Sequence, residues 1–374
     1  MRNITEKKTP AFHGGAFFSA IGDDFLTLEK SASIINADVL DAWFPPSPLV
    51  TQAIQDYLPW LIRTSPPTHC DGMVKTIAET RMVAPENILV GAGSSDLMFR
   101  SFNYWLNGKS RVLIIDPTYG EYGHILDNVI GCKTDRLLLK EENSFAFDPK
   151  DMEQLLSQQY DLIVIVNPNN PTGSHTKRSD LEDLLLKVPF QTRVWIDEAY
   201  VEYAGPDESL ETFAITRENV IVCKSMSKVY ALSGIRAGYL CAQPQTLNPL
   251  RALTPPWIVS LPGQIAATMA LRDPQYYESC YAATHLLRSE LVKTIATRTS
   301  IEIFEGVANY ILCYLPQDGL DLESFIDQCQ AQGLFIRNVW TTAPRLGSNT
   351  FRIAVKDHAT NKHMVEIIES VVNR

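Results

Sequence analysis

The stretch from Ser225 to Tyr239 reads SMSKVYALSGIRAGY and directly follows the apolar run NVIVCK. A run this apolar indicates a buried strand, so Lys228 should stand just past the end of that strand. Ser225 and Ser227 supply hydroxyl donors, and Arg236 offers a planar fork suited to phosphate. Desolvation and neighbouring cations would lower the pKa of Lys228 toward that of a nucleophilic amine; the alternative is a solvated loop lysine.

The sequence around this stretch predicts an α/β fold. Short β-branched runs alternate with helical patterns from about residue 86 onward, and the runs are ENILVGAG, RVLIIDPTY, YDLIVIVNPNNPTG, RVWIDEAY, NVIVCK and IRAGYLCA. Uniformly apolar strands are covered on both faces, which predicts a mainly parallel sheet between helices. The segment RSDLEDLLLKV predicts a crossover helix, with Ser179 and Glu182 in capping-box spacing.

A change of pattern near residue 245 predicts a second domain. Long helical segments follow there, with separated strands such as NYILCYL, LFIRNV and TFRIAVK, which is typical of an α+β domain. We expect an N-terminal arm, or part of the small domain, at residues 1–45. A large domain should cover 46–250 and a smaller C-terminal domain 251–374.

Composition excludes several classes of partner. The formal net charge of -10 disfavours nucleic acid and anionic membranes, because both are polyanions that a negative surface repels. The seven cysteines form no CxxC pair, so we expect reduced thiols, no disulfide framework and no metal site. The apolar runs are too short to span a bilayer, and the start has no apolar signal core. These features predict a soluble cytoplasmic protein that binds a small metabolite.

Polar motifs follow five of the expected strands: GAGSSD, DPTYGEY, NPNNPTG, DEAY and SMSK. In an open parallel sheet, ligands bind at the carboxyl ends of the strands, so these motifs should converge on one crevice. GAGSSD would let backbone amides approach an anion and then open a helix, whose amino end favours phosphate. The alternative for this motif is an ordinary glycine turn with serine caps.

Asp197, in WIDEAY, lies among apolar residues that should bury it. A buried carboxylate needs a partner, and the protonated ring nitrogen of a cofactor is a suitable one. A structural ion pair or a helix cap is the alternative. Together, a phosphate cradle, an aldehyde-trapping lysine and a pyridinium-stabilising aspartate indicate pyridoxal 5'-phosphate.

The chain resembles the fold-type I pyridoxal-phosphate enzymes of the aspartate aminotransferase superfamily, particularly histidinol-phosphate aminotransferases and threonine-phosphate decarboxylases. The resemblance rests on PENILVGAGSSDLM, DPTYGEY, NPNNPTG, WIDEAY, SMSKVYALSGIRAGY and FRIAV, which occur in the family's order. It implies a large cofactor-binding domain with a sheet of the seven-stranded type, and a homodimer with active sites at its interface.

The resemblance also implies individual residue roles. Lys228 forms the internal aldimine, and Asp197 pairs with the pyridine nitrogen. Tyr119 stacks on the ring, and Arg352, in FRIAV, grips the carboxylate or phosphate of the substrate. The remaining contacts are hydrogen bonds to the phenolic oxygen from Asn170 and Tyr200, and phosphate contacts from Ser94, Ser95, Ser225 and Arg236.

Three stretches depart from the family pattern. RTSPPTH has Ser65 where relatives carry a tyrosine that reaches the phosphate of the partner subunit. VLDAWFPPSP replaces an asparagine-rich segment, and its Trp43 and Phe44 could contact a partner subunit or pack within the chain. HGG at residues 13–15 is more like the decarboxylase branch.

The expected chemistry passes through an external aldimine and a Cα carbanion of an amino-acid substrate, and we expect the aminotransferase type. Cα-decarboxylation remains open, as does elimination, replacement or cyclisation of a modified amino acid. A non-catalytic cofactor-binding protein is the alternative from another class. A Rossmann dehydrogenase is disfavoured, because GAGSSD lacks the last glycine of GxGxxG.

Overall fold

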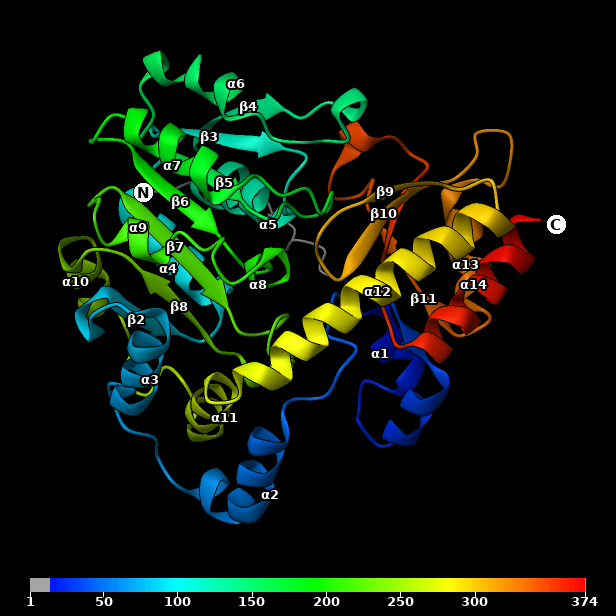
Figure 1. The fold of residues 1–374 in the computed structure, drawn as a ribbon, viewed down its shortest axis with the longest axis horizontal. Coiled ribbons are helices and arrows are strands. Elements are labelled where there is room, and N and C mark those ends of the chain that lie inside the picture. Colours follow the sequence, from blue (N-terminus) through cyan, green and yellow to red (C-terminus); the bar gives the residue numbers. More distant parts are fainter. Residues whose placement is uncertain (1–13, 374) are drawn as a thin grey trace, which may run out of the picture.

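The computed structural model describes residues 14–373, which form a seven-stranded sheet, a four-stranded sheet and a two-stranded pairing (Figure 1). The strand order of the large sheet is β2-β8-β7-β6-β5-β3-β4. All neighbouring strands in it are parallel except β8, which runs antiparallel to β2 and β7. The mainly parallel sheet is thus confirmed, with strands β2 (Ile88–Gly91), β3 (Arg111–Asp116), β4 (Lys133–Leu138), β5 (Leu162–Val166), β6 (Arg193–Asp197), β7 (Val220–Ser225) and β8 (Gly238–Cys241).

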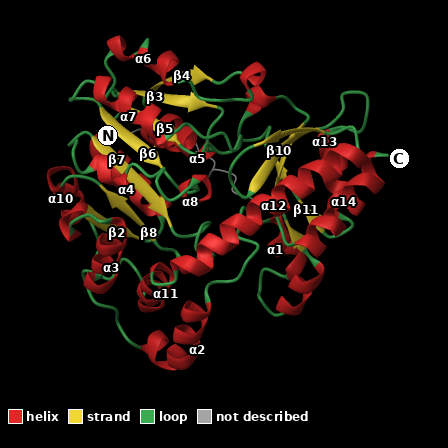
Figure 2. Cartoon of the chain, viewed as in Figure 1, coloured by secondary structure: helices red, strands yellow, loops and turns green. Residues whose placement is uncertain are grey.

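Helices cover both faces of this sheet, as Figure 2 shows. Because successive side chains of a strand point to opposite faces, β6 buries Val194 and Ile196 on one side and Trp195 on the other. The first side packs on α3 (Asp71–Arg81), α7 (Arg178–Lys187) and α11 (Leu261–Leu271), and the second on α4 (Ser94–Trp105) and α10 (Pro244–Ala252).

The edge strand β4 is not predicted from the sequence. It carries Lys133, Asp135 and Arg136 and is only partly buried, so it lacks the apolar run that reveals the central strands. Its place at the edge of the sheet explains this composition, because one side of an edge strand faces solvent.

The capping box expected for α7 is wrong. The helix begins at Arg178, so Ser179 lies inside the first turn and cannot cap it. Glu182 instead accepts a hydrogen bond from Arg178 at 2.6 Å.

The smaller C-terminal domain is built on the antiparallel sheet β12-β13-β10-β9. Its core packs this sheet against three helices, of which α12 runs from the large sheet to the small one (Figure 1). The elements are β9 (Glu302–Glu305), β10 (Tyr310–Tyr314), β12 (Arg337–Asn338), β13 (Thr350–Ala354), α12 (Pro274–Arg298), α13 (Leu322–Gln330) and α14 (His358–Val372).

The N-terminal arm packs beside the small sheet. After α1 (Ala16–Ile21), strand β1 (Ile35–Asn36) pairs in parallel with β11 (Leu334–Phe335). Further along, the indole of Trp43 donates a hydrogen bond to Thr284 at 2.8 Å, and Phe44 is buried against aromatic rings of α12. Trp43 and Phe44 therefore pack within the chain.

The remaining helices are α2 (Pro48–Arg63), α5 (Gly120–Gly123), α6 (Pro149–Glu153), α8 (Val201–Ala204) and α9 (Glu211–Ala214), with a π-helix at His124–Ile130. Helix α11 packs on α2 and α3, within the core of the large sheet.

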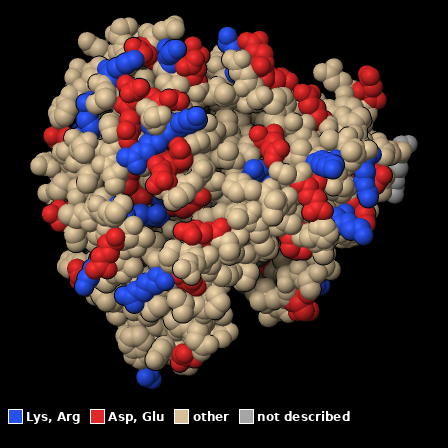
Figure 3. All heavy atoms as spheres, viewed as in Figure 1, with Lys and Arg blue, Asp and Glu red and all other residues tan. Residues whose placement is uncertain are grey.

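The domain boundaries at 45 and 250 stay predictions. Within residues 14–373, no helix combines the length and the apolar character needed to cross a membrane. On the face drawn in Figure 3, basic and acidic side chains are interspersed.

Candidate active site

A cavity of about 590 Å³ lies at the carboxyl ends of the parallel strands, beside the small sheet. Tyr119 follows β3, Asn170 follows β5, Tyr200 follows β6 and Lys228 follows β7, while Arg352 projects from β13. These five side chains, singled out from motifs that span more than half of the sequence, line this one cavity. The first four converge because their strands are parallel, which brings the carboxyl ends to one edge. Arg352 reaches the cavity from the antiparallel small sheet.

Lys228 is largely buried and makes an ion pair with Asp41, whose Oδ1 lies 3.1 Å from its Nζ. Burial lowers the pKa of Lys228, and the nearby charges of Arg352 and Arg236 act in the same direction, whereas Asp41 opposes them. The lysine is therefore not the solvated loop residue of the alternative reading. Its amine is easier to deprotonate than an ordinary lysine.

Asp197 ends β6 and is buried. It accepts hydrogen bonds from the hydroxyl of Tyr122 at 2.7 Å and from the backbone N–H of Ala199 at 3.0 Å. The indole of Trp195 in turn donates to the Tyr122 hydroxyl at 2.8 Å, which orients the phenol. Burial raises the pKa of Asp197, and these two hydrogen bonds counteract the rise.

A second group of predicted residues gathers at the start of α4. Helix α4 begins at Ser94, and the preceding Gly93 has φ 90°, a left-handed conformation that glycine tolerates. A Cβ on Gly93 would lie 2.8 Å from Nη2 of Arg236, so only glycine lets the guanidinium approach the helix start this closely. Ser225 lies on β7 opposite Gly238, which packs on the backbone between Gly93 and Ser94.

Ser94, Ser95, Ser225 and Arg236 thus lie around the helix start, but they do not line the 590 Å³ cavity itself. Ser95 and Arg236 are exposed, whereas Ser225 is buried. An anion is favoured at the start of α4. A guanidinium, hydroxyl groups and the free N–H groups of this 12-residue helix all act there.

Arg352 is buried in the wall of the cavity. Its Nη1 donates to Oδ1 of Asn170 at 2.5 Å, and its Nη2 donates to the backbone oxygen of Asp38 at 3.1 Å. Its guanidinium carbon lies 5.5 Å from the ring centre of Tyr310, whose ring also packs edge-on against Tyr200. Among the residues that the structure describes, nothing accepts a hydrogen bond from its buried Nε.

Several residues of the site are missed by the sequence reasoning. Arg337 on β12 lies directly opposite Arg352 and pairs with Asp38 at 2.8 Å. Its signal in LFIRNV, an arginine among apolar strand residues, is the same one that singled out Arg352. Asp41 and Tyr122 have no comparable signal, because only the fold brings them to Lys228 and Asp197.

Of the HGG motif, the structure describes Gly14 and Gly15, because His13 lies outside the described residues. Gly15 donates its backbone N–H to Asp38 at 2.9 Å. A Cβ on Gly14 would lie 2.3 Å from both Asp38 and Arg337. The two glycines therefore pack on the ion pair beside the cavity.

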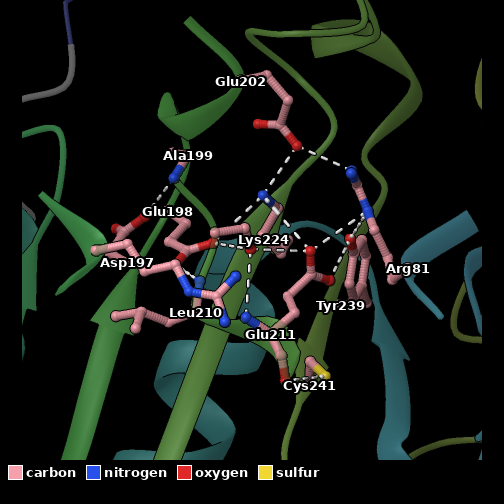
Figure 4. A network of polar contacts seen from close by, with 12 residues as sticks. Arg81, Asp197, Glu198, Ala199, Glu202, Leu210, Glu211, Lys224, Tyr239 and Cys241 are labelled. Carbon is pink, nitrogen blue, oxygen red and sulfur yellow. Dashed lines mark hydrogen bonds and ion pairs between the residues drawn. The ribbon is translucent and has the colours of Figure 1, made fainter. Parts of the chain in front are cut away.

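A buried charge network lies behind Asp197 (Figure 4). Lys224 on β7 contacts three carboxylates: Glu202 at 2.8 Å, Glu198 at 3.4 Å and Glu211 at 3.9 Å. Arg81 of α3 closes the network with contacts of 2.8 Å to Glu202 and 3.4 Å to Glu211. Lys224 and Lys228 are only four residues apart in the sequence. Lys224 lies among glutamates, whereas Lys228 lies near Arg352 and Arg236.

The chain matches the model of the family described as aminotransferase class I and II over residues 44–368. It belongs to the class I and II aminotransferase family. Enzymes of this family use pyridoxal phosphate, so the chain is a pyridoxal-phosphate-dependent enzyme. The family, the fold class and the cofactor predicted from the sequence are confirmed.

Known aminotransferases and a decarboxylase are similar to this aminotransferase-family chain. Histidinol-phosphate aminotransferase of Methanococcus maripaludis strain C6 is 24% identical over 327 residues, which is 87% of this chain and 86% of the relative. The structure of histidinol-phosphate aminotransferase from Sinorhizobium meliloti, in complex with pyridoxal-5'-phosphate, has a TM-score of 0.82 at 20% identity and covers 97% of this chain and 99% of that one. L-threonine-O-3-phosphate decarboxylase from Porphyromonas gingivalis has a TM-score of 0.78 at 19% identity, covering 91% and 100%. These structures show a shared fold, and the fold alone does not distinguish transamination from decarboxylation.

The residues present fit the cofactor of the family. The close approach of Arg236 to Gly93 leaves an anion cradle at the start of α4, as a phosphate group requires. The amine of Lys228 faces the adjoining cavity, and the buried carboxylate of Asp197 is held by uncharged donors.

Proposed function

We propose that this family member is an aminotransferase-type enzyme that acts on an amino acid, with Lys228 as the lysine that binds the cofactor. The observation that carries the proposal is the single cavity lined by Lys228, Arg352, Asn170, Tyr119 and Tyr200. An amine of lowered pKa and a buried guanidinium with a spare N–H therefore face the same space.

When bound, pyridoxal phosphate supplies an aldehyde that condenses with amines and a pyridine ring that accepts an electron pair. Asp197 would hold a proton at the ring nitrogen, positioned by Tyr122. Tyr119 would cover a face of the ring, and Asn170 and Tyr200 would hydrogen-bond its phenolic oxygen. The phosphate group would be held by Ser94, Ser95, Ser225 and Arg236.

Arg352 would grip the carboxylate of the substrate, because its buried Nε has hydrogen-bonding capacity left. With the carboxylate held in this way, Lys228 would act as the base that takes the proton from Cα of the substrate, as transamination requires. The orientation imposed by Arg352 would therefore decide whether the Cα proton or the carboxylate is lost.

The reaction class is tested by incubating the purified holoenzyme with a panel of amino acids and phosphorylated amino alcohols without any keto acid. Release of the keto acid or carbonyl product that matches the amine in a single turnover, with loss of the visible absorbance, supports transamination. Release of carbon dioxide would contradict it in favour of decarboxylation. Turnover with neither signal would indicate elimination, replacement or cyclisation.

The role of Lys228 is tested by Lys228→Ala. The visible absorbance of the lysine-linked cofactor should disappear in this variant, because no other lysine is assigned to the aldehyde. Lys177→Ala, at an exposed position before α7, is the matched control and should keep the absorbance. A visible band that survives both Lys228→Ala and borohydride treatment of the wild type would refute the assignment.

The expected homodimer and the cytoplasmic location belong to this proposal as well. Within the described residues, helix α2 exposes large apolar side chains, including Tyr57, Trp60 and Ile62, on a face that a second copy could cover. Ser65, at the position of the missing tyrosine, follows this helix and is exposed.

A further inference from the structure

We propose that Asp41 is a positioning residue that sets the proton affinity of the Lys228 nitrogen, with Lys356 as the opposing charge. The inference rests on the proposed function, in which Lys228 binds the cofactor. Oδ1 of Asp41 lies 3.1 Å from Nζ of Lys228. A carboxylate at this distance stabilises the protonated, cationic form of the nitrogen.

The segment that carries Asp41 is fixed on both sides. Before it, the backbone N–H of Ala354 donates to the oxygen of Ala37 at 3.0 Å, and the side chain of Asn309 donates to the oxygen of Leu40 at 3.2 Å. After it, Trp43 donates to Thr284 at 2.8 Å. These contacts join the arm to the small domain, so the Asp41 carboxylate is held at Lys228 by the fold.

The surroundings of this ion pair are strongly cationic. Arg352 from β13 and Arg236 from the loop before β8 both act on Lys228. Lys356, just after β13, lowers the pKa of Asp41. Burial lowers the pKa of Lys356 to about 8, with Lys228 lowering it further and Asp41 opposing. Asp41 therefore contacts Lys228 directly and also acts electrostatically on Lys356.

The two neighbours of Lys228 have opposite effects. Asp41 raises the pKa of the Lys228 nitrogen by stabilising its cation. Repulsion from Lys228 lowers the pKa of Lys356, and because this repulsion is mutual, Lys356 should in turn disfavour the cation of Lys228. Removing the charge of Asp41 should lower the pKa of that nitrogen. Removing the charge of Lys356 should raise it.

The test is a pH titration of the visible absorbance of the holoprotein, between about pH 5 and pH 10, for the wild type, Asp41→Asn and Lys356→Met. Asp41→Asn keeps the shape of the side chain and should move the midpoint down by about one pH unit or more. Lys356→Met should move the midpoint up by roughly half a unit or more. A residue with a merely structural role would leave the midpoint unchanged.

Asp183→Asn, at an exposed site on α7, is the matched control and should leave the midpoint unchanged. Thermal unfolding of each variant establishes that it is folded, and Lys356→Met tests the inference even if Asp41→Asn does not fold. A midpoint that is unchanged, or that shifts in the opposite direction, in either folded variant overturns the inference. A band that titrates in none of the three proteins overturns it as well. Loss of the band in Lys228→Ala together with unchanged midpoints would refute the role of Asp41 while leaving the proposed function intact.

Discussion

Arg352 is a buried cation whose hydrogen bonds to Asn170 and Asp38 leave its Nε without a partner among the described residues. A buried charge that is only partly satisfied is costly, and a carboxylate ligand would complete its hydrogen bonding. Burial, followed by repulsion from Arg337, lowers the pKa of Arg352. In the proposed function, this guanidinium would therefore be ready for the carboxylate of the substrate.

We expect Arg352→Gln to lower kcat/KM for amino-acid substrates by roughly 30-fold or more, because a desolvated charge pair is lost. The visible absorbance of the bound cofactor should persist, since other residues are proposed to hold it. Steady-state kinetics measure the first effect and absorbance the second. Arg345→Gln, at an exposed arginine paired with Asp116, is the control and should change kcat/KM little. Unchanged kinetics in Arg352→Gln would contradict its role.

At the scale of elements, strand β7 supplies both Lys224 and, just past its end, Lys228. Lys224 is fully buried in the network of Figure 4, where burial lowers its pKa but Glu202, Glu211 and Glu198 raise it above the ordinary value. Lys228 has one carboxylate nearby, and burial lowers its pKa. The environment on either side of the strand end therefore separates a lysine that is held as a cation from one that is easier to deprotonate.

Lys224→Met should destabilise the fold by roughly 3–5 kcal/mol, because it leaves the buried Glu198 without a cation and leaves Glu202 and Glu211 with Arg81 alone. Urea or thermal unfolding measures the change in the free energy of unfolding. Lys187→Met breaks an exposed ion pair with Glu153 and, as the control, should cost less than about 1 kcal/mol. Equal effects of the two substitutions would show that the network does not stabilise the fold.

Glu198, which follows β6 and pairs with Lys224, makes the stability of the fold depend on pH. Burial raises its pKa from 4.5 to about 7, although Lys224 opposes the rise. Between these two pH values the folded state binds more protons than the unfolded state, so this contribution to stability falls as pH rises and is constant above about 7. Relative to the wild type, Glu198→Gln should gain stability between about pH 5 and pH 8, on the order of 1 kcal/mol per unit of pKa shift. Unfolding curves at both pH values check this, and a difference that is independent of pH would contradict it.

At the scale of the whole molecule, α2 lies at the margin of the structure (Figure 1) and exposes Tyr57, Trp60 and Ile62. Its other side packs on α11, so the exposed face is not needed for the core of the chain. Apolar side chains gathered in this way are typical of an interface between subunits. This face is our candidate for the proposed homodimer contact.

Ile62→Asp should weaken dimerisation by roughly 10-fold or more without unfolding the subunit, because a charge would be buried at the interface. Light scattering across a concentration series measures the dissociation constant. Leu286→Asp, at a similarly exposed position on α12, is the control and should not alter it. A wild-type protein that is monomeric at all concentrations would refute the interface.

The fold class and most of the candidate site can be predicted from the sequence alone, because apolar strands followed by polar motifs specify where a parallel sheet places its chemistry. Lys228, Asp197 and Arg352 could be found in this way, since each interrupts or follows an apolar run. The edge strand β4, the helix start of α7 and the partners Asp41 and Tyr122 depend on the packing of the folded chain. Asp41 and Lys228 are 187 residues apart, and no local pattern records a contact of that range. Packing of the arm on the small domain brings the two together, which is why the electrostatics of Lys228 could only be read from the folded chain.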